Sequence, residues 1–299
     1  MPELEVRNLT KRYGSTVAVD DLSFAVEPGR VTGFLGPNGA GKTTTMRALL
    51  GLLRPSGGEA LVESRPPTAM AEPLGTIGAA LEATAFHPGR SGRNHLRCLA
   101  TAAGLPTRRV DEVLEMVELS GAAGRRVKGY SLGMRQRLAL AAALLGEPRI
   151  LILDEPANGL DPQGMRWLRD LLKAQAAEGR TVLVSSHVLS EVAQVADELI
   201  VIRDGRLVSH STLEEFTAGG QAPLRVRAAA PDRLAAALAE RGAEVEPDDG
   251  ALMVRGLSGQ QVGELALSLG IALHELAPQH SSLEARFLEV MDSEEGTAE

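Results

Sequence analysis

Residues 36–43 read Gly36-Pro37-Asn38-Gly39-Ala40-Gly41-Lys42-Thr43, and they match G-x-x-x-x-G-K-[ST] at every fixed position. The apolar residues 31–35 before them predict a short buried strand, and residues 44–53 after them predict a helix. A glycine-rich turn between a strand and a helix presents backbone N–H groups to an anion, and glycine lets the backbone approach phosphate closely. The sequence therefore predicts a loop that binds the phosphates of a nucleoside triphosphate.

The residue types within this loop predict separate roles. Lys42 is expected to reach the β- and γ-phosphates, and the Thr43 hydroxyl is expected to hold Mg²⁺. We expect the whole segment through Thr44 to contact the nucleotide. ATP and Mg²⁺ are therefore the predicted cofactors.

A second apolar run, residues 150–153, ends in two acids, Asp154 and Glu155. In a nucleotide-binding α/β sheet, the carboxyl ends of the strands face the ligand. Asp154 is then placed to hold Mg²⁺, directly or through water, and Glu155 to polarise an attacking water as a general base. Without the phosphate loop, the same pattern would describe a strand that simply reaches solvent.

The overall composition is that of a soluble globular protein. The chain has 299 residues, 44% apolar and 23% charged, with a net charge of -8, which argues against a nucleic-acid partner. The single cysteine, Cys98, excludes an intrachain disulfide and a cysteine zinc cluster. Because the sequence lacks both a long apolar run and a signal-peptide core at its start, we expect a cytoplasmic protein.

The pattern of apolar residues and turn signals predicts two domains. The first spans residues 1–217, with a helical subdomain at about 87–145 and a β-hairpin around Asp204-Gly205. A linker at 218–223 leads to a small α/β domain at 224–291, and the tail is 292–299. The second domain is expected to hold strands at 224–228, 251–255 and 271–276, and helices at 232–241, 259–269 and 282–291.

A further segment carries a family resemblance. Residues 131–134 read Ser131-Leu132-Gly133-Met134, which resembles the L-S-G-G-Q marker of ATP-binding-cassette (ABC) transporters. Ser131 and Gly133 match the marker, whereas Leu132 and Met134 depart from it. Together with the phosphate loop and the two acids, residues 3–217 resemble the ATP-binding subunit of such a transporter. A plain helix N-cap remains the alternative interpretation of Ser131.

The resemblance implies an α/β fold. It has the P-loop NTPase core of ABC ATPases, an antiparallel β subdomain and a helical subdomain, here followed by the small C-terminal α/β domain. It also implies that two copies sandwich two ATP molecules. Ser131 and Gly133 of one copy would then contact the γ-phosphate held by the other copy.

The resemblance assigns roles to three further residues. Tyr13 matches the aromatic residue that stacks on adenine, and His187 matches the catalytic histidine that contacts the γ-phosphate. Asp161, within Asn158-Gly159-Leu160-Asp161-Pro162, matches the loop that joins the two nucleotide sites across the dimer. The open alternatives are a surface tyrosine, a structural histidine and an aspartate that caps the following helix.

Glu82 departs from the family pattern, which has glutamine after the apolar residues 76–81. By resemblance, Glu82 would sense Mg²⁺ or water near the nucleotide and lie near the membrane partner. A carboxylate there would add negative charge beside the metal. The alternative is a solvated loop residue.

The function implied by the resemblance is that of an ATPase which powers a separate transmembrane permease. It would work as a dimer at the cytoplasmic face of the cell membrane. Glu82 and the Ser-Leu-Gly-Met variant favour export of a drug, antibiotic or lipid-like cargo. The alternatives are a soluble ABC ATPase that acts on ribosomes or DNA, and a regulator that works through the C-terminal domain.

Overall fold

The computed structural model describes residues 3–70, 72–81, 86–218, 223–278 and 287. The chain forms two compact units, Met1–Leu213 and Glu214–Glu299. The boundary expected at residue 217 lies inside helix α8 (Leu213–Ala218). In the described ranges, no helix combines the length and apolar character needed to cross a bilayer.

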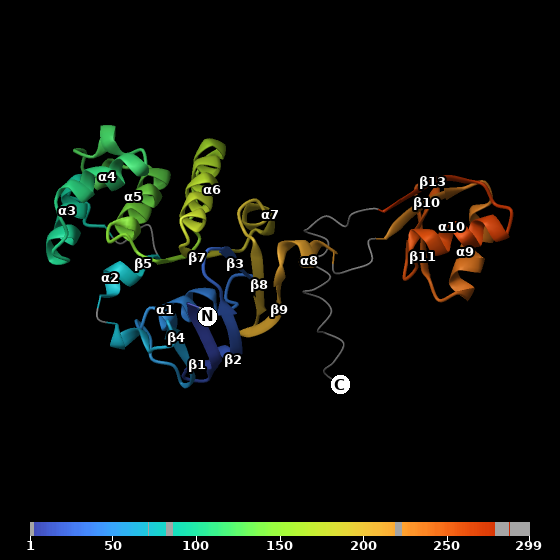
Figure 1. Ribbon diagram of the computed structural model, residues 1–299, viewed down its shortest axis with the longest axis horizontal. Helices are drawn as coiled ribbons and strands as arrows, with labels where there is room; N and C mark the ends of the chain where they lie inside the picture. Colours follow the sequence, from blue (N-terminus) through green and yellow to red (C-terminus); the bar gives the residue numbers. More distant parts are fainter. Residues whose placement is uncertain (1–2, 71, 82–85, 219–222, 279–286, 288–299) are drawn as a thin grey trace. The chain divides into compact units, whose positions relative to one another are not determined.

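A six-stranded sheet forms the centre of the first unit (Figure 1). Its strands lie in the order β5 (Ile77–Ala80), β6 (Ile150–Leu153), β7 (Thr181–Ser186), β3 (Val31–Leu35), β8 (Glu198–Arg203) and β9 (Arg206–Thr212). The first five are parallel, and β9 pairs antiparallel with β8 through the hairpin predicted around Asp204-Gly205. The carboxyl ends of β3, β6 and β7 therefore meet at one edge of the sheet.

A second, antiparallel sheet packs over helix α1 (Lys42–Leu49). It consists of β2 (Thr16–Val26), β1 (Leu4–Tyr13) and β4 (Gly57–Val62), in that order. Leu9 and Phe24 of this sheet share one apolar core with Met46 of α1 and with Phe34 and Ile200 of the central sheet. Burial of this core fixes α1, and with it the loop that precedes the helix.

Helices cover the other side of the central sheet. α3 (Gly92–Ala102), α4 (Arg108–Met116) and α5 (Leu132–Leu144) share a second core with α6 (Pro162–Ala177) and the central strands. α5 lies so close to β5 that a Cβ on Gly78 would sit 2.1 Å from the Ala143 carbonyl oxygen. The shorter helices are α2 (Pro73–Thr76), α7 (Leu189–Val192) and the 3₁₀ turns η1 (Pro67–Ala69), η2 (Ser120–Ala122) and η3 (Val127–Gly129).

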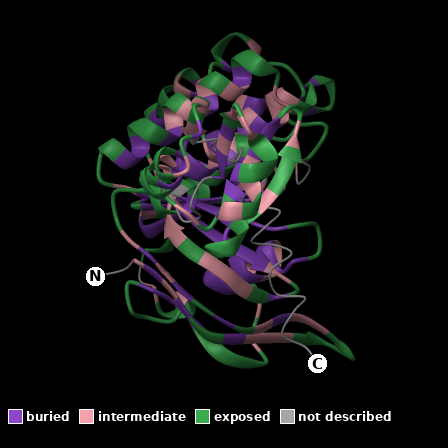
Figure 2. Cartoon of the chain, turned by 90° about the vertical axis from the view of Figure 1, so that its right-hand side faces the viewer, coloured by how far each residue is buried: buried purple, intermediate pink, exposed green. Residues whose placement is uncertain are grey.

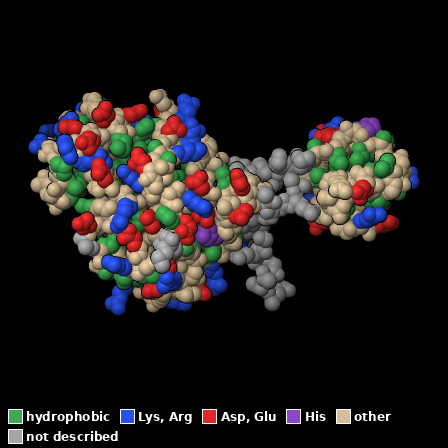
Figure 3. Space-filling model, in the orientation of Figure 1, with side chains coloured by type: hydrophobic (Ala, Val, Ile, Leu, Met, Phe, Trp, Pro, Cys, Tyr) green, Lys and Arg blue, Asp and Glu red, His purple; other side chains and the backbone are tan. Residues whose placement is uncertain are grey.

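The distribution of side chains follows this layering. Figure 2 shows buried residues along the strands and on the inner sides of the helices, with exposed residues on the outer sides. On the face seen in Figure 3, acidic and basic side chains are interspersed in each unit. Cys98 lies exposed on α3.

His95 on α3 is expected to make the stability of the first unit depend on pH. Its ring packs edge-on against Phe86, and its Nδ1 is buried without a hydrogen-bond partner among the described residues. Burial, helped by the charge of Arg90, lowers the pKa of His95 below 6.5. The neutral ring is therefore favoured in the folded chain.

We expect the free energy of unfolding to fall between about pH 7 and pH 5, because the unfolded chain then binds the His95 proton more readily. The contribution is present above pH 6.5 and is lost as the pH falls through the lowered pKa of His95. Urea unfolding across this range should show a shallower pH dependence for His95→Gln. Equal slopes for the two proteins would contradict this prediction.

The second unit is a four-stranded antiparallel sheet with two helices on one face. Its elements are β10 (Leu224–Ala228), α9 (Pro231–Glu240), β11 (Glu244–Asp248), β12 (Ala251–Arg255), α10 (Gly259–Ser268) and β13 (Leu273–Pro278), and the strand order is β11-β12-β10-β13. Leu234 and Leu238 of α9 and Val262 of α10 pack on Val226 and Val254 of the sheet. Ser258 and Gln261 form a capping box at the start of α10.

Two features of this unit differ from the sequence prediction, and one predicted helix lies almost entirely outside the described residues. Strand β11 was not predicted, because its sequence is polar and contains Pro247, which an edge strand tolerates. The last strand begins at Leu273 rather than at residue 271. The helix expected at 282–291 falls, apart from residue 287, outside the described residues.

Candidate functional site

Residues 36–41 join β3 to α1, and Lys42 and Thr43 begin the helix, two residues earlier than the sequence predicted. Gly41 immediately precedes the helix with a φ of +101°, and a Cβ there would lie 2.6 Å from the Ala18 carbonyl oxygen. Only glycine fits this turn, because other residues would meet both the backbone strain and the contact with β2. The loop therefore presents its N–H groups at the start of α1, where the helix dipole favours an anion.

Lys42 is folded back over this loop. Its side chain is 6% exposed, and Nζ donates to the carbonyl oxygens of Gly36 at 2.6 Å and Pro37 at 3.1 Å. Burial lowers the pKa of Lys42, and the carboxylates of Glu155 and Asp154 oppose that shift. The ammonium group thus lies at the base of the loop, where the phosphate groups of a nucleotide would offer it stronger partners than two carbonyls.

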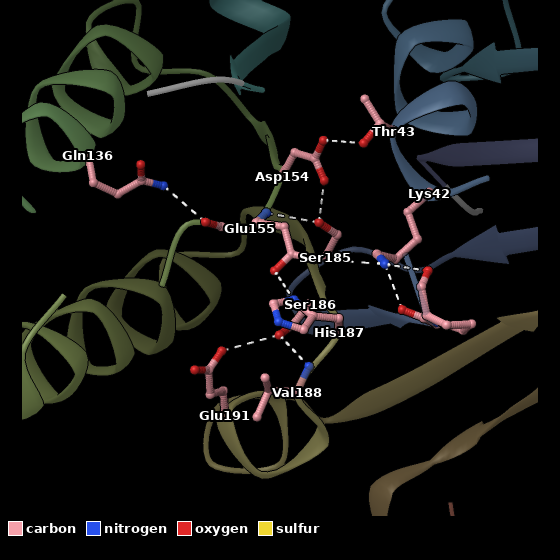
Figure 4. Close-up of polar contacts among 12 residues, drawn as sticks. Lys42, Thr43, Gln136, Asp154, Glu155, Ser185, Ser186, His187, Val188 and Glu191 are labelled. Carbon is pink, nitrogen blue, oxygen red and sulfur yellow. Dashed lines mark hydrogen bonds and ion pairs between the residues drawn. The ribbon is translucent and has the colours of Figure 1, made fainter. Parts of the chain in front are cut away.

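Asp154, at the end of β6, accepts two hydrogen bonds. The hydroxyl of Thr43 donates to Oδ2 at 2.6 Å, and the hydroxyl of Ser185 donates to Oδ1 (Figure 4). Thr43 and Asp154 thereby bring together oxygen donors of the kind that Mg²⁺ prefers. Among the described residues, no group of three or more acidic, histidine or cysteine side chains is arranged so that it could hold a metal ion by itself. This donor set fits a Mg²⁺ ion that takes its remaining ligands from phosphate and water.

Glu155 lies between a cation and an imidazole. Its Oε1 is 3.7 Å from Lys42 Nζ, and its Oε2 is 2.8 Å from His187 Nδ1. The carboxylate is 20% exposed and His187 is 40% exposed, so both reach solvent. A carboxylate held in this way can accept a proton from water, and the imidazole can donate a hydrogen bond or carry charge.

The phosphate loop lines a surface depression of about 210 Å³. Its lining contains most of the residues predicted from the phosphate loop and from the end of β6: Asn38, Gly39, Ala40, Gly41, Lys42, Thr43, Thr44, Asp154 and Glu155, together with Ala18. The structure therefore brings the two separately predicted segments together on one surface.

Ser131, Gly133 and Asp161 lie elsewhere on the chain. Ser131 Oγ accepts from Met134 N at the start of α5, and Asp161 Oδ1 accepts from Gly164 N at the start of α6. A Cβ on Gly133 would lie 3.2 Å from the Gly159 carbonyl oxygen, so the first turn of α5 packs against the segment that contains Gly159. Among the described residues, the lining of the depression includes none of the three.

Tyr13 and Glu82 complete the predicted set. Tyr13 ends strand β1 with 49% of its surface exposed, and Lys11 Nζ lies 5.1 Å from its ring centroid. An exposed aromatic face of this kind can stack on a base. Glu82 lies outside the described residues.

Two residues at the site were missed by the sequence prediction. Ser185 Oγ accepts from the backbone N–H of Glu155 at 2.9 Å, and Gln136 Nε2 donates to the Glu155 carbonyl oxygen at 3.2 Å. The available signal was a polar residue in an apolar setting, since Ser185 lies next to the last residue of the buried strand β7 and Gln136 lies on the alanine- and leucine-rich helix α5.

Comparisons with known proteins identify the family of this chain. Residues 19–158 match the family model described as ABC transporter, and residues 222–284 match a domain of unknown function, DUF8746. The chain is 38% identical over 290 residues to the Uncharacterized ABC transporter ATP-binding protein YhcH of Bacillus subtilis, covering 96% of this chain and 95% of that protein.

Two further similarities cover most of the chain or its first unit. The Bacitracin transport ATP-binding protein BcrA of Bacillus licheniformis is 35% identical over 297 residues, which cover 96% of this chain and 97% of BcrA. The solved structure "Structure of ATP binding subunit of ABC transporter" has a TM-score of 0.65 and 28% identity, and the match covers 72% of this chain and 92% of that one. The chain belongs to the ABC transporter family, as an ATP-binding subunit that hydrolyses ATP.

Proposed function

We propose that the depression over the phosphate loop binds Mg·ATP and that Glu155 is the base for its hydrolysis. The observation that carries this proposal is the position of the Glu155 carboxylate, between Lys42 and His187 and beside the Thr43–Asp154 pair. Loop N–H groups hold the phosphates, and Lys42 leaves the carbonyls of Gly36 and Pro37 to contact them.

The chemistry needs a proton acceptor and stabilisation of negative charge. Glu155 orients a water molecule and takes its proton, while His187 contacts the γ-phosphate and steadies the Glu155 carboxylate. Thr43 and Asp154 would hold Mg²⁺, which supplies charge neutralisation at the phosphate oxygens when bound. We also propose that Glu82 contacts the metal or its water.

The site of one chain is proposed to be completed by a second copy. Ser131 and Gly133 lie at an exposed helix start outside the depression, where the N-terminus of α5 suits a phosphate group. In a dimer, this segment would contact the γ-phosphate held by the partner's loop. Asp161, at the adjacent start of α6, would link the two sites.

The output of the cycle is proposed to be transport by a separate transmembrane permease, with this subunit at the cytoplasmic face of the membrane. A match over nearly the full length of a bacitracin transport protein supports this assignment. The Ser131-Leu132-Gly133-Met134 variant favours export. ATP binding closes the dimer and hydrolysis reopens it, and the permease alternates with these states.

Co-expression tests this proposal directly. We expect a multispan membrane protein to be encoded beside this chain. When the chain is expressed with that protein, it should appear in the membrane fraction, and without that protein it should remain unattached. The purified complex in lipid should hydrolyse ATP faster when its cargo is present. A chain that never associates with that membrane protein would contradict the transport role.

Tyr13 offers a separate test of where the base binds. Tyr13→Ala is expected to weaken ATP binding by about 1–3 kcal/mol, because an exposed aromatic ring stacks on a base. Tyr13→Phe should retain the affinity, and tripolyphosphate, which has no base, should bind wild type and Tyr13→Ala alike. Titration calorimetry measures all three. Equal losses for ATP and tripolyphosphate would show that Tyr13 does not stack on adenine.

A further inference from the structure

Glu155 adopts a backbone conformation that a glutamate rarely takes. Its φ is +49°, in the left-handed region, although only Asp154 separates it from the extended strand β6. A non-glycine residue stays in this region when its surroundings determine the conformation. The turn at Glu155 directs its side chain toward Lys42 and His187 rather than along the strand (Figure 4).

Hydrogen bonds hold both ends of the Glu155 backbone. Its N–H donates to Ser185 Oγ at 2.9 Å. Its carbonyl oxygen accepts from Gln136 Nε2 at 3.2 Å and from Asn158 N at 3.2 Å. Two of the three partners are side chains on distant elements, β7 and α5, so tertiary structure sets this conformation.

The Ser185 hydroxyl can hydrogen-bond to both the Asp154 carboxylate and the Glu155 backbone N–H in only one arrangement. An ionised carboxylate can only accept, so the single Ser185 proton goes to Asp154 Oδ1. The oxygen of Ser185 is then free to accept the N–H of Glu155. Ser185 is fully buried, so water does not compete for these bonds.

Gln136 provides a second side-chain hydrogen bond to the Glu155 backbone, from helix α5. Its side chain is 4% exposed on α5, the same helix that Ser131 caps. The amide of Gln136 therefore connects the helix that begins at Ser131 to the carbonyl group of Glu155.

We propose that Ser185 is a positioning residue, which holds the Glu155 carboxylate in its reactive orientation while fixing Asp154, and that Gln136 supports it from α5. This inference rests on the proposed role of Glu155 as the base. Neither side chain lines the depression, so their effect on catalysis passes through the Glu155 backbone and Asp154.

The main test is Ser185→Ala, assayed at saturating Mg²⁺. We expect kcat to fall about 10- to 100-fold, as for other residues that orient a reactive group, with KM for ATP within about threefold of wild type. The backbone N–H of Glu155 should exchange faster with deuterium, because its acceptor is gone.

Thr32→Val is the matched control. Thr32 is a fully buried hydroxyl residue on the adjacent strand β3, and its Oγ1 has no hydrogen-bond partner among the described residues. This variant should keep wild-type kcat and exchange at Glu155. Ser185→Thr should restore most of the turnover, since it retains the hydroxyl and a cavity of about 30 Å³ adjoins Ser185.

Gln136→Met keeps the test decisive if Ser185→Ala folds poorly. This substitution removes the Gln136 side-chain amide, which acts from α5 and not from β7, and methionine is similar in volume to glutamine. It should also lower kcat with little change in KM. Wild-type kcat in folded Ser185→Ala or Gln136→Met would overturn the proposal, as would an equal loss in Thr32→Val. Substantial turnover in Glu155→Gln would instead refute the assignment of the base, which separates the two failures.

Discussion

Replacing Glu155 with glutamine is expected to lower ATP turnover by about 10²- to 10⁴-fold, the range for loss of a general base. Glutamine has nearly the same size, and the backbone contacts of Glu155 to Ser185 and Gln136 remain. The amide cannot take a proton from water, whereas Lys42 and the loop still bind the phosphates. Steady-state phosphate release gives kcat, and titration with ATP gives the affinity.

The same variant should accumulate an ATP-bound dimer. In the proposed cycle, the dimer closes when ATP binds and opens when ATP is hydrolysed. Blocking hydrolysis therefore leaves the closed dimer populated. Size-exclusion chromatography should show the dimer with ATP and a monomer with ADP. Glu178→Gln is the control, since the Glu178 side chain is 58% exposed and its ion pair with Arg180 contributes little to stability. Wild-type hydrolysis in Glu155→Gln would contradict the assignment of the base.

Changing Ser131 to aspartate is expected to reduce hydrolysis by about 10²- to 10³-fold, the cost of losing a preorganised contact to developing charge. Aspartate is as good an N-cap as serine, so α5 should keep the cap that Ser131 Oγ provides to Met134 N. The new carboxylate would instead repel the γ-phosphate across the dimer. Phosphate release and ATP-dependent dimerisation measure the effect.

Two controls separate the roles of Ser131. Thermal unfolding of Ser131→Asp should match wild type, because the helix cap is retained. ATP binding to a single chain should also be unchanged, since Ser131 does not line the depression. If Ser131→Asp hydrolysed ATP like wild type, Ser131 would be a helix cap and nothing more.

Much of this site could be predicted because most of its functional residues lie in short consecutive segments of the sequence. The phosphate loop spans residues 36–43, and Asp154 and Glu155 adjoin an apolar strand, so pattern and strand direction together predicted their meeting. Ser185 and Gln136 act as single residues brought to Glu155 by the folding of β7 and α5. Each is a polar residue in an apolar setting, but no local pattern links either of them to Glu155.

The limits of prediction in the C-terminal unit have a similar physical origin. Strands β10 and β12 and helices α9 and α10 were predicted from their apolar periodicity, which the sheet and its helices bury. Strand β11 carries few apolar residues, and pairing with β12 holds it at the sheet edge. Backbone pairing leaves little trace in side-chain pattern, so such a strand is easily missed.

The central claim is that each site combines the phosphate loop of one chain with the Ser131 segment of another. Mixing two inactive variants, Lys42→Met and Ser131→Asp, tests this claim most directly. In a mixed dimer, one site pairs the wild-type Lys42 of one chain with the wild-type Ser131 of the other.

Single-turnover hydrolysis, which needs only one working site, is the measurement. If each site combines two chains, each variant alone should be inactive and the mixture should regain hydrolysis as mixed dimers form. If Ser131 acted on the nucleotide of its own chain, every site in the mixture would carry a defect. A mixture no more active than its separate components would therefore contradict the account.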